Sequence, residues 1–150
     1  ITGIPKLEFD DKSVSGIGDI KDTFDQVKAK DDSTGKMFRV YNAAFARFPD
    51  SDGLEYWIDN FSSGRNSIRV VALSFLDSAE FAEQYGDNVT NGTYVQNLYR
   101  NVLNRDLDQS GYDYWVGNLN NGVEQRHEVL IGFAESIENK ALFSEMTGLF

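Results

Sequence analysis

Apolar side chains recur every three or four residues through most of the chain, a spacing that places them on one face of an α-helix. In the first half they form three stripes, which are Met37, Val40, Tyr41, Ala44 and Phe45, then Leu54, Trp57, Ile58 and Phe61, then Ile68, Val71, Ala72, Phe75, Leu76 and Ala79. In the second half the stripes are Val95, Leu98, Tyr99, Val102 and Leu103, then Tyr112, Trp115, Val116 and Leu119, then Val129, Leu130, Phe133, Ala134 and Ile137. This pattern predicts a mainly α-helical chain.

The two sets of stripes belong to an internal repeat. Tyr41 and Tyr99 stand 58 positions apart, and the same offset brings twelve identical pairs, including both tryptophans, into register without a gap. The pairs are Tyr41/Tyr99, Arg47/Arg105, Asp50/Asp108, Gly53/Gly111, Tyr56/Tyr114, Trp57/Trp115, Asn60/Asn118, Gly64/Gly122, Val71/Val129, Phe75/Phe133, Ser78/Ser136 and Glu80/Glu138. Self-similarity at a fixed period is the signature of a repeat architecture.

Each unit alone would expose an apolar face, so we expect the two units to pack together on a shared core. The prediction is two tandem copies of a three-to-four-helix unit, residues 37–92 and 93–150, within a helical repeat domain that covers residues 34–150. We interpret the repeated residues as the turn, cap and core residues of these units.

The joints between the stripes carry helix-boundary residues. Residues 52–55 (Asp-Gly-Leu-Glu) and 110–113 (Ser-Gly-Tyr-Asp) resemble capping boxes, and residues 93–96 (Thr-Tyr-Val-Gln) match that signature more closely. Gly64 and Gly122 follow the second stripe of each unit, where a left-handed C-cap residue is expected.

Residues 1–33 lie outside the repeat and are predicted to form an extended or partly helical lead-in. Ile4, Leu7 and Phe9, with polar neighbours, indicate a short extended arm or β-hairpin that ends near residue 10. The next apolar residues have helical spacing, although a strand is the alternative there. They are Ile17, Ile20, Phe24 and Val27.

Composition and charge narrow the function classes. An apolar fraction of 41% fits a folded domain, whereas a net charge of -10 argues against nucleic-acid partners, which are bound by clustered cations. No apolar stretch is long enough to span a bilayer, so we expect no membrane insertion. The chain has no cysteine, which excludes disulfides and thiol chemistry. Because it begins Ile-Thr-Gly, with neither an initiator Met nor a signal peptide, we expect a fragment of a longer protein.

The only cations retained in both units are Arg47 and Arg105, each close in sequence to a retained aspartate, Asp50 or Asp108. One hypothesis makes the arginines contacts for an anion or a sugar. The alternative, which we favour, is an arginine fork that bridges this aspartate and the retained glutamate, Glu80 or Glu138, in each unit.

A calcium site is the one metal hypothesis that the residues support. Asp106, Asp108, Ser110 and Asp113 look like the start of an oxygen-ligand loop, and counting from Asp106 places Gly111 sixth, as in an EF-hand. The twelfth position, however, is a glycine and supplies no carboxylate. Helix capping by the same oxygens is therefore the preferred interpretation.

No catalytic constellation stands out. His127 is the only histidine and lies among glutamates without a nucleophile motif, so we interpret it as a solvated surface residue. The Tyr-Trp pairs at 56–57 and 114–115 suggest carbohydrate stacking, but both tryptophans fall on apolar stripes, which favours core packing. We expect no enzyme activity and no cofactor apart from the calcium candidate.

Several stretches resemble a bacterial family known only as domain of unknown function four-two-one-four. They are residues 7–11, 38–50, 78–86, 95–105 and 132–139. The resemblance implies a helical domain of secreted and cell-surface proteins, often beside RTX calcium-binding repeats, with a plan similar to phycobilisome linker domains. It brings no catalytic residue.

The resemblance also implies an extracellular or cell-surface location in a bacterium, with other domains of the same exported protein or cell-surface components as partners. The expected function is a non-catalytic structural or interaction module that assists display, assembly or anchoring. A ligand-binding module for calcium or a cell-surface glycan is the alternative.

Overall fold

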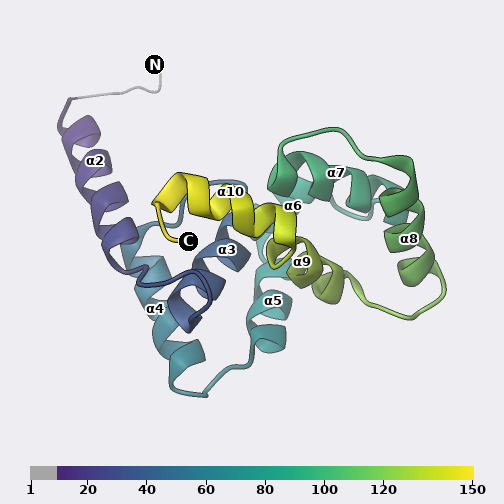
Figure 1. Ribbon diagram of the computed structural model, residues 1–150, viewed down its shortest axis with the longest axis horizontal. Helices are drawn as coiled ribbons and strands as arrows, with labels where there is room; N and C mark the ends of the chain where they lie inside the picture. Colours follow the sequence, from purple (N-terminus) through teal and green to yellow (C-terminus); the bar gives the residue numbers. More distant parts are fainter. Residues whose placement is uncertain (1–9) are drawn as a thin grey trace.

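The structure, a computed structural model, describes residues 10–150, and in this range every regular element is an α-helix (Figure 1). The helices are α2 (Asp10–Asp25), α3 (Ser33–Phe45), α4 (Ser51–Ser62), α5 (Ile68–Leu76), α6 (Ala79–Tyr85), α7 (Asn91–Leu103), α8 (Gln109–Asn120), α9 (Arg126–Ala134) and α10 (Ile137–Thr147). The mainly helical prediction is confirmed. The predicted arm or β-hairpin at Ile4, Leu7 and Phe9 lies outside the described residues.

The tandem repeat is confirmed in the backbone. The bounds of α3, α4 and α5 recur at the same 58-residue offset in α7, α8 and α9, so each unit contains four helices, α3–α6 and α7–α10. The first helix of each unit ends at a residue in the left-handed region, Ala46 at φ 54° and Asn104 at φ 56°. Gly64 and Gly122, just past the second helices, have φ of 81° and 70°, as predicted.

The predicted capping boxes are wrong by two or three residues. The N-caps of α4 and α8 are Asp50 and Asp108, so Gly53 and Gly111 fall at the third helical position and cannot return a side-chain bond. Thr93 likewise lies inside the first turn of α7, where its backbone N–H donates to the N-cap Thr90. Short polar side chains are frequent throughout these turns, and only the backbone path decides which one caps the helix.

The two units share one hydrophobic core, as expected. Helix α3 packs against α7 and α9, and α5 packs against α9. Helices α6 and α10 each contact both units: α6 lies against α3 and α7, and α10 against α7, α3 and α9 (Figure 1). The core therefore runs continuously from one unit to the other.

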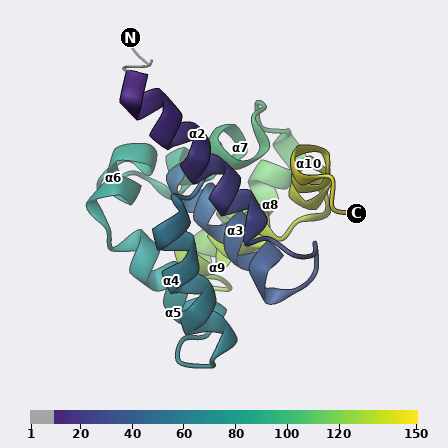
Figure 2. The ribbon, with the colours of Figure 1, turned by 90° about the vertical axis from the view of Figure 1, so that its left-hand side faces the viewer.

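Helix α2 has no counterpart in the repeat and lies beside α4 (Figure 2). The side chain of Asp19 accepts hydrogen bonds from the Ser51 N–H and hydroxyl at 3.1 and 2.5 Å, and Thr23 Oγ1 donates to the Pro49 carbonyl at 2.7 Å. The Phe24 ring lies 5.3 Å from that of Phe48. Of the two readings for this region, the helical one is correct.

None of the helices in the described part of the chain has the length and apolar character needed to cross a membrane.

Candidate functional site

The retained arginines form the same bidentate fork in both units. Arg47 donates from Nε and Nη2 to the two carboxylate oxygens of Glu80 at 2.6 and 3.0 Å, and Arg105 does so to Glu138 at 2.7 and 2.9 Å. Each arginine also lies near the N-cap aspartate of the following helix. The fork joins the turn after the first helix of a unit to the start of its fourth helix.

A buried tyrosine completes each fork. Tyr41 donates from its hydroxyl to Asp50 Oδ1 at 2.9 Å, and the Arg47 guanidinium lies 5.4 Å from the centre of the Tyr41 ring. In the second unit the Arg105 guanidinium lies 5.1 Å from the Tyr99 ring. Burial and the nearby Asp108 carboxylate raise the pKa of Tyr99 to about 12.

Three carboxylates of the network, those of Asp50, Asp108 and Glu138, are held in their charged form. Burial opposes ionisation of Asp50, but hydrogen bonds from Tyr41 and its own backbone and the charge of Arg47 outweigh it, so the pKa of Asp50 lies below its usual value. The Gly111 N–H and then Arg105 lower the pKa of Asp108, and the Arg105 hydrogen bond lowers that of Glu138. These groups remain anionic at neutral pH and serve as hydrogen-bond acceptors within the fold.

The repeated glycines are required by the tyrosines. A Cβ atom at Gly53 would lie 2.9 Å from the Tyr41 hydroxyl, and one at Gly111 would lie 2.3 Å from that of Tyr99. Any larger residue would push the tyrosine away from its helix terminus. The repeated Tyr, Arg, Asp, Gly and Glu of each unit are thus brought together in one contact network.

The repeated tryptophans pack partly buried on the core, and Trp115 borders the network of its unit, because it lines the same small cavity as Tyr99, Arg105 and Glu138. Trp57 contacts the Phe75 ring edge-on at 5.0 Å, and Trp115 lies 5.2 Å from Phe133. The neighbouring Tyr56 and Tyr114 remain 58% and 60% exposed.

Three of the four calcium candidates, Asp108, Ser110 and Asp113, are engaged within the fold. Asp108 accepts from Arg105 through one oxygen and from the Gly111 N–H and the Ser110 hydroxyl through the other. Asp113 accepts from Gln109 Nε2 at 2.8 Å, and Asp106 is exposed. Across the residues that the structure describes, no group of three or more histidine, aspartate or glutamate side chains is arranged to hold a metal ion.

The interpretation of His127 as a surface residue is wrong. Its side chain is 1% exposed, and its Nε2 atom has no hydrogen-bond partner among the described residues. Burial, and then the nearby charge of Arg69, lowers the pKa of His127. His127 precedes Leu130 and Ala134 at helical spacing, and this shared face was the available signal for burial.

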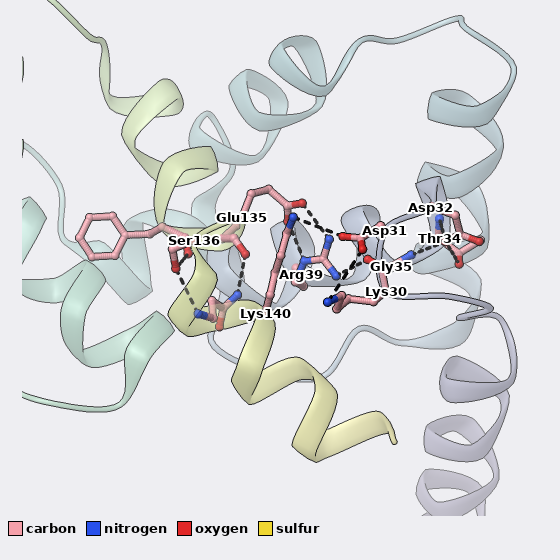
Figure 3. Close-up of polar contacts among 12 residues, drawn as sticks. Lys30, Asp31, Asp32, Thr34, Gly35, Arg39, Glu135, Ser136 and Lys140 are labelled. Carbon is pink, nitrogen blue, oxygen red and sulfur yellow. Dashed lines mark hydrogen bonds and ion pairs between the residues drawn. The ribbon is translucent and has the colours of Figure 1, made fainter. Parts of the chain in front are cut away.

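An ion pair that the repeat pattern does not predict joins the two units (Figure 3). Arg39 in α3 is 1% exposed and donates from Nε and Nη2 to the two oxygens of Glu135, both at 2.8 Å. Its Nη1 atom donates to the Lys30 carbonyl at 2.7 Å, and its guanidinium lies 4.8 Å from the Phe143 ring. The available signal was a single arginine within an otherwise apolar stretch of α3.

The loop before α3 is tied to the same region. Asp32 caps α3 by accepting from the Thr34 and Gly35 N–H groups, each at 3.0 Å, and Asp31 pairs with Lys140 of α10 at 3.4 Å (Figure 3). The Arg39–Glu135 pair and the Asp31–Lys140 pair thus fix the lead-in loop, α3 and the second unit to one another.

Comparison with known proteins identifies the family. The sequence profile described as Domain of unknown function (DUF4214) matches the chain twice, over residues 27–82 and 72–143. No curated protein and no solved structure matches the chain. The two matched segments follow the two structural units, the first from just before α3 and the second from within α5. Together they span most of the sequence, and the chain belongs to the DUF4214 family.

Proposed function

We propose that this chain is a non-catalytic structural and interaction module of an exported bacterial protein, in which it assists display, assembly or anchoring. The observation that carries the proposal is the twin arginine network. The charged side chains that the two units share bond to one another: Arg47 to Glu80 and Asp50, and the equivalent Arg105 to Glu138 and Asp108. Because these charged groups bond to one another, they support a structural role for the repeat.

The connection between the units supports the same role. Helices α6 and α10 bridge the units, and the buried Arg39 of the first unit pairs with the half-buried Glu135 of the second, so the two copies form one continuous body. Such a body can hold neighbouring parts of a larger protein at a fixed separation. Ile137 and Phe150 are 90% and 87% exposed and offer apolar contact area to another domain or to a cell-surface component.

The proposal can be tested in the bacterium that makes the protein. Residues 27–143 of the parent protein would be replaced by an unrelated helical domain of similar length, and the amount of protein at the cell surface and in the medium would be measured. We expect display or assembly to fall while synthesis of the protein is unchanged. Unaltered display and assembly would contradict the proposal.

A matched variant separates shape from side-chain chemistry. Asp52→Asn, Glu55→Gln and Asp113→Asn together change exposed carboxylates outside the arginine forks. We expect this variant to fold and to be displayed and assembled like the parent. A folded variant that fails in display or assembly would show that carboxylate chemistry, and not the framework, carries the function.

A further inference from the structure

A groove of about 490 Å³ opens at the boundary between the units, where the C-terminal ends of α3 and α7 meet α10. Its size falls within the range of about 300–1,000 Å³ that is usual for small-molecule sites. Asn42 and Phe48 line it from the first unit, Asn101 and Asn104 from the second, and Met146 from α10. The two units contribute different side chains to this groove. The geometry that the two arginine networks have in common therefore does not account for it.

The three asparagines offer polar atoms that the fold leaves available. Asn42 donates from Nδ2 to the Arg47 carbonyl at 2.8 Å, and Asn101 donates from Nδ2 to the Gln84 carbonyl at 3.0 Å. These bonds hold both amides in place and leave their Oδ1 atoms as acceptors. The exposed Asn104 amide, which makes no side-chain hydrogen bond within the described part of the chain, retains both its donors and its acceptor.

The groove also presents apolar surface to solvent. Phe48 is 42% exposed and Met146 is 38% exposed. The Phe48 ring is steadied from behind by Phe24 at 5.3 Å and by Phe38 at 6.5 Å. An exposed ring with a fixed position can cover the C–H face of a ligand at low entropic cost.

The charge of the lining selects a neutral ligand. None of the described residues that line the groove is acidic, although the chain carries a net charge of -10. The one cation in the lining, Arg47, is already paired with Glu80 and Asp50. A metal ion would find no carboxylate there, and an anion would find no free positive charge.

We propose that this groove binds a neutral saccharide, with the Asn42, Asn101 and Asn104 amides bonding its hydroxyl groups and Phe48 and Met146 covering the apolar face of a sugar ring. Side-chain amides suit this ligand because they donate and accept in one plane, as pairs of sugar hydroxyls require. The inference goes beyond the structural role proposed above and does not depend on it.

Solution NMR of the whole chain tests the proposal directly. The isotopically labelled protein would be titrated separately with cellobiose, maltose, lactose and diacetylchitobiose, and with a capped tetra-alanine peptide. We expect at least one disaccharide to shift the side-chain amide signals of Asn42, Asn101 and Asn104 together. If no disaccharide shifts them, or if only the peptide does, the proposal is overturned.

Two glycine variants supply the decisive comparison. Asn104→Gly removes the groove amide, and Asn88→Gly removes an amide elsewhere; both asparagines have positive φ, 56° and 58°, which glycine adopts freely. We expect Asn104→Gly to weaken disaccharide binding about five-fold, the usual effect of losing a hydrogen bond, and Asn88→Gly to leave it unchanged. Equal affinity in the two variants would overturn the proposal even if a disaccharide binds.

Discussion

The two units have the same helices but different surroundings. Helix α4 of the first unit is covered by α2 and buries Leu54 and Asn60, whereas α8 of the second unit buries no residue completely. Two positions beneath α2 also differ between the units. In the first unit, Phe38 and Phe48 pack against Phe24 of α2. The residues at the same repeat positions in the second unit are Gln96 and Asp106.

The ion pair between the units shows the same lack of symmetry. The repeat equivalent of Arg39 is Asn97, and that of Glu135 is Asp77, so a second buried pair does not form across the boundary. Residues shared by the units thus build each unit, and residues that differ decide what each unit contacts. The following predictions test this division.

The largest effect is expected from breaking the buried pair. Glu135→Gln leaves the Arg39 charge 1% exposed without its carboxylate partner, and we expect the free energy of unfolding to fall by about 3 kcal/mol. Denaturant unfolding would measure this loss. The control is Asp77→Asn, at the equivalent exposed position of the first unit, for which we expect a change of less than about 0.5 kcal/mol. Equal effects in the two variants would contradict the assigned role of the pair.

The second prediction replaces Phe48, which packs against α2, with the aspartate found at the equivalent position of the second unit. Phe48→Asp removes the contact with Phe24 and should cost about 1–2 kcal/mol, less than a fully buried phenylalanine because Phe48 is 42% exposed. Hydrogen exchange should show α2 opening while α7–α10 stay protected. Asp106→Phe is the reverse exchange, and α2 should be unaffected by it. Full protection of α2 in Phe48→Asp would show that the Phe24–Phe38 contact and the polar contacts of Asp19 and Thr23 hold it without Phe48.

The third prediction concerns His127, where the first unit has Arg69. Because burial lowers the pKa of His127 below its unfolded value of about 6.5, the unfolded chain takes up the proton first, and stability should fall as the pH decreases from 7 towards 5. The slope cannot exceed about 1.4 kcal/mol per pH unit for one proton. In His127→Leu this dependence should disappear, as measured by unfolding at several pH values. A slope that survives in the variant would assign the effect to other groups.

The smallest effect is expected at the ends of the first helices. Ala46→Gly relieves the positive φ of alanine and should stabilise the chain by about 0.5–1 kcal/mol, whereas Asn104→Ala should destabilise it by a similar amount. Thermal unfolding of both variants would measure these shifts. A loss of stability in Ala46→Gly would mean that the methyl group of Ala46 contributes more by packing than the backbone strain costs.

Most of the fold could be predicted from the pattern of the chain. Helical periodicity can be read within a short segment, and the 58-residue offset can be found by comparing the chain with itself. Together they predict two helical units, their shared core, and the glycines after the second helices. The caps of α4, α7 and α8 were misplaced because several neighbouring residues carry suitable oxygens. The choice among them depends on where the backbone leaves the preceding turn.

The sequence by itself determined the repeat, the helical class and the residues that the units share. Only the tertiary structure decided the contacts between non-equivalent positions: the Arg39–Glu135 pair, the packing of α2 against the first unit and the asparagine-lined groove. The physical reason is that periodicity reports which face of a helix is apolar, whereas a contact between distant residues depends on how two faces meet. Arg39 and Glu135 are 96 positions apart, and nothing in either local pattern specifies the other.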